Sequence, residues 1–242
     1  MDKNKINNKA NETSEMDEAP GLSAPINGKK IYLVRHGKTE WNKTLRYQGI
    51  TNIPLSEEGL EQARKVGLRF ANAKVDVVIS SPLRRACETA ECIARHHSLK
   101  VETLDLLKEV NFGEWEGLTV KEIIARCGSE FFYKWRCNQL HVGVKGGEDM
   151  DELSERSRKA AEILLKRPEM NIVVVGHGAM LRSLLLPLLG LPRSNIFWKT
   201  RIENCSISAV TLEGKSQFVL AFMNDTLHLR VAESDIKMLP LL

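Results

Sequence analysis

The 242-residue sequence predicts an α/β fold in which a mostly parallel sheet lies between two layers of helices, a three-layer α/β/α sandwich. Two observations predict it. From Lys30 onward, apolar strand-like runs alternate with segments of helical periodicity. The runs at Lys30–Arg35 and Asn171–Gly176 are apolar almost throughout instead of alternating, which is typical of parallel strands buried on both faces.

The composition excludes several classes of protein. Apolar and charged residues make up 43% and 27% of the chain, which is ordinary for a soluble globular protein. The net charge of +4 is small, and no Lys/Arg cluster indicates a nucleic-acid partner. The most apolar stretch, residues 184–191, is interrupted by Pro187 and is far shorter than the ~20 residues of a membrane span. Five cysteines without a CxxC pair, and no stretch patterned like a signal peptide, favour the reducing cytoplasm.

Residues 1–28 differ in composition from the rest. Asn, Lys, Glu, Ser and Pro dominate there, aromatic residues are missing, and the apolar residues follow no period. Such a segment cannot bury enough apolar surface to offset the entropy lost on ordering. We therefore expect a disordered N-terminal tail over residues 1–28 and one domain over residues 29–242.

A chain that begins at Gly28 is accordingly expected to fold with its melting temperature, and any activity, unchanged. Thermal unfolding of the full-length and shortened chains checks this. A melting temperature lower by several degrees in the shortened chain would show that the tail docks on the domain.

Six segments have the β-favouring composition of strands. They are residues 30–35, 75–80, 101–106, 171–176, 205–211 and 218–223. The helical segments between the first four imply a mostly parallel sheet covered on both faces, and the last two segments close it.

Cap residues indicate where helices begin. Ser56 precedes a helix that reaches about Asn72, with two acidic residues in its first turn. Thr119 and Glu122 form a capping box for a short helix. Further helices are expected from Pro82 to about residue 96, over 129–138 and 149–167, and from the fourth strand to residue 189, with Pro187 disturbing the last turn.

Polar side chains directly follow three of these strands. Arg35 and His36 end the first, a pair at Arg84 and Arg85 follows the second, and His177 follows the fourth. Open α/β sheets bind ligands at the carboxyl edge of parallel strands, so both histidines and one of the two arginines are expected in a shared pocket. Taken alone, each histidine is equally compatible with a structural role, and the arginine pair is equally compatible with exposure to solvent.

These residue types suit a phosphate better than a metal ion, because carboxylates do not cluster with them. A phosphoryl group carries about two negative charges at neutral pH, and a guanidinium group can donate two parallel hydrogen bonds to two of its oxygens. One neutral imidazole can attack phosphorus while the other donates a hydrogen bond to a phosphoryl oxygen. Gly37 is expected to let the chain turn sharply and a ligand approach closely.

An ordered series of motifs resembles the histidine phosphatase superfamily, also called phosphoglycerate mutase-like proteins. Residues 35–42 resemble its RHGxTxxN signature, and residues 80–90 match its SSxLxRAxxTA pattern, which singles out Arg85. Residues 109–117 resemble the segment that supplies the acid. The other similar segments are 47–49, 52–63, 146–148, 176–178 and 204–207. The resemblance covers the chain after the tail and implies the phosphoglycerate mutase-like fold.

The resemblance implies a role for each matching residue. His36 would be the nucleophile that becomes phosphorylated, and Arg35, Arg85 and His177 would surround the phosphate. Glu109 would protonate the leaving oxygen and then activate the water that cleaves the phosphohistidine. Further substrate contacts are expected from Asn42, Gln48, Gly49 and Gly178.

Four further expectations concern other residues. A hydrogen bond from Nδ1 of His36 to the Gly37 carbonyl would leave Nε2 free to attack. Lys38, where the family commonly has Glu, is expected to point away from the phosphate. His228 is expected near the pocket mouth. The remaining histidines, His96, His97 and His141, are expected to be ordinary surface or supporting residues.

The resemblance implies a phosphomonoester hydrolase that needs neither metal nor cofactor. The branch of α-ribazole phosphatases and broad-specificity phosphatases fits best, because cofactor-dependent mutases carry a long Pro-rich insertion between the acid and the second histidine. Here the segment from Glu109 to His177 is compact. Its aromatic residues either form a wall against the leaving group or pack into a local core. They are Phe131, Phe132, Tyr133 and Trp135.

The expected partner is a small organic phosphate ester, with α-ribazole 5′-phosphate as one candidate. A phosphoglycerate mutase and a non-catalytic module that binds a phosphorylated ligand are the alternatives. Neither nucleic acid nor a membrane is expected as a partner, and the sequence leaves monomer and homodimer open.

Overall fold

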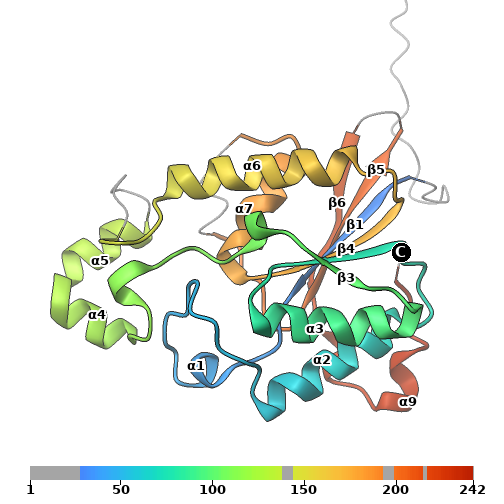
Figure 1. Cartoon of the computed structure of the whole chain (residues 1–242), viewed down its shortest axis with the longest axis horizontal. Coiled ribbons are helices and arrows are strands. Elements are labelled where there is room, and N and C mark those ends of the chain that lie inside the picture. Colours follow the sequence, from blue (N-terminus) through green and yellow to red (C-terminus); the bar gives the residue numbers. More distant parts are fainter. Residues whose placement is uncertain (1–27, 138–143, 193–198, 215–216, 242) are drawn as a thin grey trace, which may run out of the picture.

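The computed structural model describes residues 28–137, 144–192, 199–214 and 217–241 (Figure 1). Residues 1–27 of the expected tail lie outside them. Within the described residues a six-stranded sheet has the order β3-β2-β4-β1-β5-β6. The strands are β1 (Lys30–Arg35), β2 (Val77–Ser80), β3 (Val101–Thr103), β4 (Asn171–Gly176), β5 (Ile207–Glu213) and β6 (Gln217–Asp225). The first four run parallel and β5 is antiparallel to both of its neighbours, so the mostly parallel sheet is confirmed.

Helices cover both faces of this sheet. Those that the structure describes include α1 (Glu40–Lys43), α2 (Glu57–Phe70), α3 (Arg84–Ala94), α4 (Val120–Cys127), α5 (Ser129–Arg136), α6 (Met150–Lys166), α7 (Gly178–Leu188) and α9 (Glu233–Ile236). Ile31 and Leu33 of β1 belong to the core shared with α6 and α7, whereas Tyr32 and Val34 belong to the core shared with α2 and α3. The three-layer α/β/α sandwich is therefore confirmed.

Most helix starts agree with their predicted caps. Ser56 Oγ accepts a hydrogen bond from the Gly59 N–H, and Thr119 and Glu122 form the capping box of α4. The start predicted at Pro82 is wrong, because α3 begins at Arg84. Ser81 Oγ accepts a hydrogen bond from the Leu83 N–H, which satisfies this donor in a turn ahead of the helix. The third strand, β3, ends at Thr103 and not at the predicted residue 106, because a 3₁₀ turn over Asp105–Leu107 follows it.

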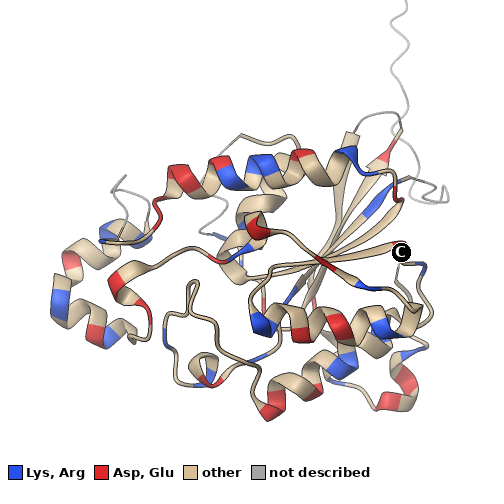
Figure 2. Ribbon diagram, in the orientation of Figure 1, with Lys and Arg blue, Asp and Glu red and all other residues tan. Residues whose placement is uncertain are grey.

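The helices α6 and α7 differ in solvent exposure. Acidic and basic residues alternate along the outer face of α6 (Figure 2), where Arg158 lies within ion-pair distance of Glu155 and Glu162. By contrast, α7 is almost entirely buried and apolar. No helix within the described residues is long and apolar enough to cross a bilayer.

A third, smaller core lies beyond one end of the sheet, where α4 and α5 form a separate group (Figure 1). Its centre is Trp115, Ile123, Phe132 and Trp135, with Tyr47 packed against it. This group, called the α4–α5 group below, forms one side of the pocket described next.

Candidate active site

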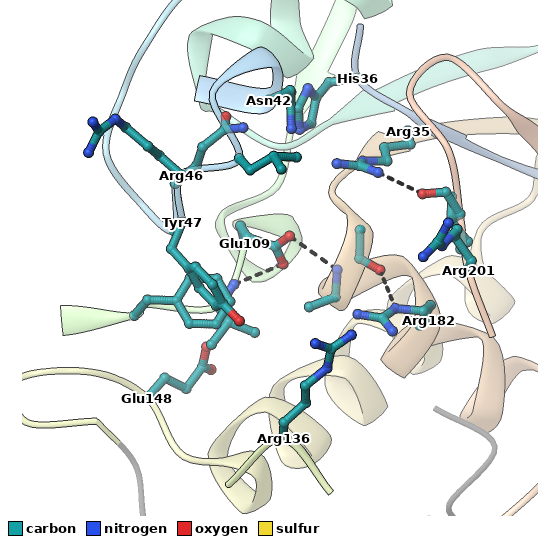
Figure 3. A pocket seen from close by; sticks show the side chains of 18 of the residues that line it. Arg35, His36, Asn42, Arg46, Tyr47, Glu109, Arg136, Glu148, Arg182 and Arg201 are labelled. Carbon is teal, nitrogen blue, oxygen red and sulfur yellow. Dashed lines mark hydrogen bonds between the residues drawn. The ribbon is translucent and has the colours of Figure 1, made fainter. Parts of the chain in front are cut away.

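The main pocket, a cavity of ≈ 620 Å³, lies where β1 ends and α7 begins (Figure 3). Eight of the nine predicted site residues line it: Arg35, His36, Asn42, Gln48, Gly49, Arg85, Glu109 and Gly178. The ninth, His177, lies beside His36, with 5.0 Å between the ring centroids. The structure therefore brings all nine residues together.

Strand register explains why the two histidines meet. β1 and β4 are parallel neighbours in which Arg35 lies opposite Gly176. The next residue of each strand is a histidine, and the His36 N–H donates to the Gly176 carbonyl over 3.0 Å. The sheet ladder thus delivers both imidazoles to one edge at the same level.

The His36 ring has a defined tautomer. Its Nδ1 lies 2.6 Å from the Gly37 carbonyl oxygen, which can only accept, so Nδ1 carries the proton, as predicted. Burial, followed by the positive charges of Arg85 and Arg35, holds the pKa of His36 well below its usual range. The ring is therefore neutral at pH 7, with a lone pair on Nε2.

Gly37 has a packing role in addition to the expected ones. Its N–H donates to Thr89 Oγ1 over 3.1 Å, and a Cβ at this position would lie 2.5 Å from the Gly59 carbonyl oxygen. The close approach of the start of α2 therefore requires a glycine here, and the expected approach of a ligand stays a prediction.

Arg85 and Arg35 are held by backbone carbonyls. Arg85 donates from Nη1 to the Thr51 carbonyl (2.8 Å) and from Nη2 to the Gly49 carbonyl (2.7 Å), and burial lowers its pKa to about 10. Arg35 donates from Nη1 to the Ile202 carbonyl (2.7 Å). The Nε atoms of both arginines are buried and have no hydrogen-bond partner among the described residues. A buried N–H group without an acceptor destabilises the folded protein, and an acceptor that binds there removes this penalty.

Glu116, which the sequence did not single out, supports this arrangement. Its carboxylate accepts hydrogen bonds from the backbone N–H groups of Ile50 and Thr51, each over 2.9 Å. It thereby fixes the loop whose carbonyls hold Arg85, including Gly49, whose positive φ of 52° suits glycine.

His177 is fully buried, and one of its two ring nitrogens has a hydrogen-bond partner among the described residues. Its Nε2 lies 2.8 Å from Ser81 Oγ, while Nδ1 has no partner among the described residues. Burial, then the charges of Arg85, His36 and Arg35, holds the pKa of His177 well below its usual range, so this imidazole is also neutral at pH 7.

Glu109 lies at the N-terminus of α7. Its carboxylate accepts hydrogen bonds from the Ala179 N–H (3.1 Å) and the Met180 N–H (3.0 Å), where the helix dipole favours an anion. Arg156 of α6 fixes the preceding backbone by donating to the Leu106 and Lys108 carbonyls over 2.7 and 2.8 Å. Arg156 also pairs with Glu148 over 2.7 Å, with both side chains mostly buried. This support was absent from the sequence predictions.

Besides the Nδ1 hydrogen bond of His36, the prediction for Lys38 is confirmed and the prediction for His228 is wrong. Lys38 pairs with Glu58 on the exposed surface and does not line the pocket. His228 does not line it either, because it is fully buried in a 3₁₀ turn (Leu227–Leu229) packed against α2. Asn42 caps α1 by accepting from the Thr39 N–H over 3.1 Å, and it lines the pocket as well. The prediction for His141 lies outside the described residues.

The aromatic residues of α5 divide between the two predicted roles. Phe132 is fully buried in the α4–α5 group, and Phe131 and Tyr133 are partly exposed and do not line the pocket. Only Trp135 of these four lines it, so the predicted aromatic wall is mostly wrong. Further aromatic lining comes from Tyr47 and Phe112.

Sequence reasoning also missed four arginines that line the pocket: Arg46, Arg136, Arg182 and Arg201. Only Arg182 had a local signal, because it lies four residues after Gly178 and so on the same side of the helix. No group of three or more His, Cys, Asp or Glu side chains arranged to hold a metal ion occurs in the described part of the chain.

Comparisons with known proteins agree with the resemblance seen in the sequence motifs. The family model of the histidine phosphatase superfamily (branch 1) matches residues 31–226. Phosphoserine phosphatase 1 of Hydrogenobacter thermophilus is 34% identical over 201 residues, which are 83% of this chain and 94% of the relative. The probable phosphoglycerate mutase GpmB of Yersinia pestis is 35% identical over 216 residues, 85% of this chain and 97% of the relative.

Among solved structures, the α-ribazole phosphatase of Shigella flexneri superposes with a TM-score of 0.72 at 27% identity, covering 81% of this chain and 96% of that one. Sequence motifs, fold and comparisons agree that the chain belongs to branch 1 of the histidine phosphatase superfamily.

Proposed function

We propose that this phosphatase hydrolyses small phosphomonoesters through a phosphohistidine formed on His36. The observation that carries the proposal is the neutral imidazole of His36, whose Nδ1 is bonded to the Gly37 carbonyl and whose Nε2 faces a pocket with two guanidinium groups. A neutral ring with a free lone pair is a nucleophile, and the guanidinium groups stabilise charge on the phosphoryl oxygens.

In the first step Nε2 of His36 forms the bond to phosphorus as the bond from phosphorus to the ester oxygen breaks. Glu109 gives its proton to the leaving oxygen, so that a neutral alcohol departs. In the second step water attacks phosphorus, Glu109 accepts a proton from this water, and the phosphorus–nitrogen bond breaks. Inorganic phosphate is released and His36 returns to its neutral form.

Buried polar atoms around His36 support this placement of the phosphate. Arg35 Nε, Arg85 Nε and His177 Nδ1 are buried, and none has a partner among the described residues. Three phosphoryl oxygens would offer acceptors to them. For His177, the O–H of Ser81 would donate to Nε2, leaving the proton on Nδ1. Asn42, Gln48, Gly49 and Gly178 would contact the phosphoryl group or the alcohol.

The substrate class is a small organic phosphate ester, and α-ribazole 5′-phosphate is one candidate within it. Turnover of p-nitrophenyl phosphate tests the chemistry itself, and its absence would favour the alternative of a non-catalytic binding module. A panel of phosphate esters then ranks the candidates. Location in the cytoplasm is a further proposal, which the five free cysteines support.

We predict phosphate release without a bisphosphoglycerate primer, and little interconversion of phosphoglycerates. A mutase must shield its phosphohistidine from water until a second substrate collects the phosphoryl group. The compact segment between Glu109 and His177 lacks the long insertion expected of cofactor-dependent mutases. Incubation with 3-phosphoglycerate, with and without 2,3-bisphosphoglycerate, distinguishes the two activities. If 2-phosphoglycerate forms faster than free phosphate, the protein acts as a mutase.

A further inference from the structure

Positive charge extends beyond the phosphate end of the pocket. As seen from His36 in Figure 3, the guanidinium groups of Arg136 and Arg182 lie beyond Glu109, and Arg201 lies to one side. They come from three parts of the chain, namely the last turn of α5, the second turn of α7, and the segment that follows α7.

The two exposed members of this group, Arg136 and Arg201, are not balanced by ion pairs with acids that the structure describes. Glu148, the other acidic residue that lines the pocket, is paired with Arg156 over 2.7 Å. Arg46, in contrast to the distal group, is paired with Glu122 over 3.0 Å. Neither Arg136 nor Arg201 forms an ion pair with any acidic residue that the structure describes, and both side chains are exposed.

Arg182 is the half-buried member of the group. It donates from Nε to the Gly178 carbonyl (2.9 Å) and from Nη1 to the Thr200 carbonyl (3.2 Å), which fixes its plane. Burial lowers the pKa of Arg182, Glu109 opposes this shift, and the positive charges of Arg136 and Arg201 add to it. Like charges held together in a partly dry site are unfavourable, and an anion among them removes that cost.

We propose that Arg136, Arg182 and Arg201 form a second anion subsite, which binds an oxyanion on the alcohol part of the substrate. The proposal rests on the phosphatase function proposed above. Guanidinium groups pair with carboxylate and phosphate oxygens alike, so the shared chemistry is an oxyanion. A cavity of ≈ 620 Å³ has room for an alcohol part that spans both subsites. A substrate with a neutral alcohol part, such as α-ribazole 5′-phosphate, would leave this subsite unused.

Matched esters test the subsite. 3-Phosphoglycerate and glycerol 3-phosphate differ by one carboxylate, and glucose 1,6-bisphosphate and glucose 6-phosphate differ by one phosphate. We expect kcat/KM to be at least about tenfold higher for the acidic member of one pair, the scale of a charge-assisted hydrogen bond. The pair that shows the preference identifies the oxyanion as carboxylate or phosphate.

Variants connect the preference to these residues. Arg136→Ala and Arg201→Ala are each expected to lower the ratio of kcat/KM within the preferred pair by about 5- to 30-fold. Both residues are exposed, so the variants are expected to fold. Arg126→Ala is the matched control, because Arg126 is an exposed arginine of the α4–α5 group that does not line the pocket. It should leave the ratio unchanged.

Two outcomes would overturn the subsite: ratios near one for both pairs, or a preference that Arg136→Ala and Arg201→Ala leave intact. Hydrolysis of p-nitrophenyl phosphate reports the chemistry independently of the subsite. If that activity is missing, titration calorimetry of the matched esters with the full-length protein still measures the preference as a ratio of Kd values. Failure of the proposed function and failure of the subsite are thereby distinguished.

Discussion

His36→Ala is expected to lower phosphatase turnover by roughly 10³-fold or more, as the removal of a nucleophile does in other hydrolases. Alanine retains the backbone hydrogen bond to Gly176 but has no Nε2 to attack phosphorus. The phosphoenzyme trapped by rapid quench in the wild type, which should be labile in acid and stable in base, should also disappear. Steady-state rates and radiolabelled substrate measure both effects.

A second histidine variant controls for the loss of an imidazole outside the pocket. His96→Ala removes an exposed imidazole from the 3₁₀ turn that follows α3, outside the pocket lining, and should keep full activity and the phosphoenzyme. If His36→Ala retains as much as a tenth of wild-type activity while folded, His36 is not the nucleophile.

Glu109→Gln is expected to slow hydrolysis of alkyl phosphates by about 10²- to 10⁴-fold and of activated aryl phosphates much less. An alkoxide is a poor leaving group and needs a proton, whereas a nitrophenolate departs without one. The amide has no proton of suitable acidity to give. Rates with glycerol 3-phosphate and p-nitrophenyl phosphate, compared as a ratio, measure this difference.

The ratio matters because Glu109 also contacts the first turn of α7, where an amide replaces only part of the hydrogen bonding. A general disturbance of the helix would slow both esters equally. Glu148→Gln supplies the comparison, since this second acidic residue of the pocket pairs with Arg156 and has no proposed proton transfer. Any loss there should be equal for the two esters. Equal losses in Glu109→Gln would remove Glu109 from the acid role.

The parts of the fold that were predictable have local signals. β1 and β4 begin and end at the predicted residues, because each is a continuous apolar run flanked by polar residues. Both histidines were expected together because parallel strands deliver their carboxyl ends to one edge. The separation of the aromatic residues of α5 into buried and exposed ones also has a signal in the sequence, which the prediction did not use. Phe132 and Trp135 are three residues apart and share the buried face of the helix.

The features that were missed depend on contacts distant in sequence. Arg136 and Arg201 line the same pocket although α5 and the segment after α7 are distant in the sequence. His228 is buried because its turn packs against α2, and no neighbour in the sequence indicates this. The support of Glu109 by Arg156 joins residues 47 to 50 positions apart through backbone carbonyls. Such carbonyls leave no pattern in side-chain sequence.

The hydrogen-bonded register of β1 and β4 has a consequence for how this scaffold diversifies. In the proposed function, the phosphate chemistry is anchored to strand ends that the ladder holds in place, with Arg35 opposite Gly176. Much of the wall around the alcohol comes instead from the α4–α5 group, which has its own core outside the sheet. Selection can therefore change the residues of the α4–α5 group without altering the strand ends that hold the phosphate-binding residues. For protein engineering, exchanging this group is a route to new substrates that leaves the reaction unchanged.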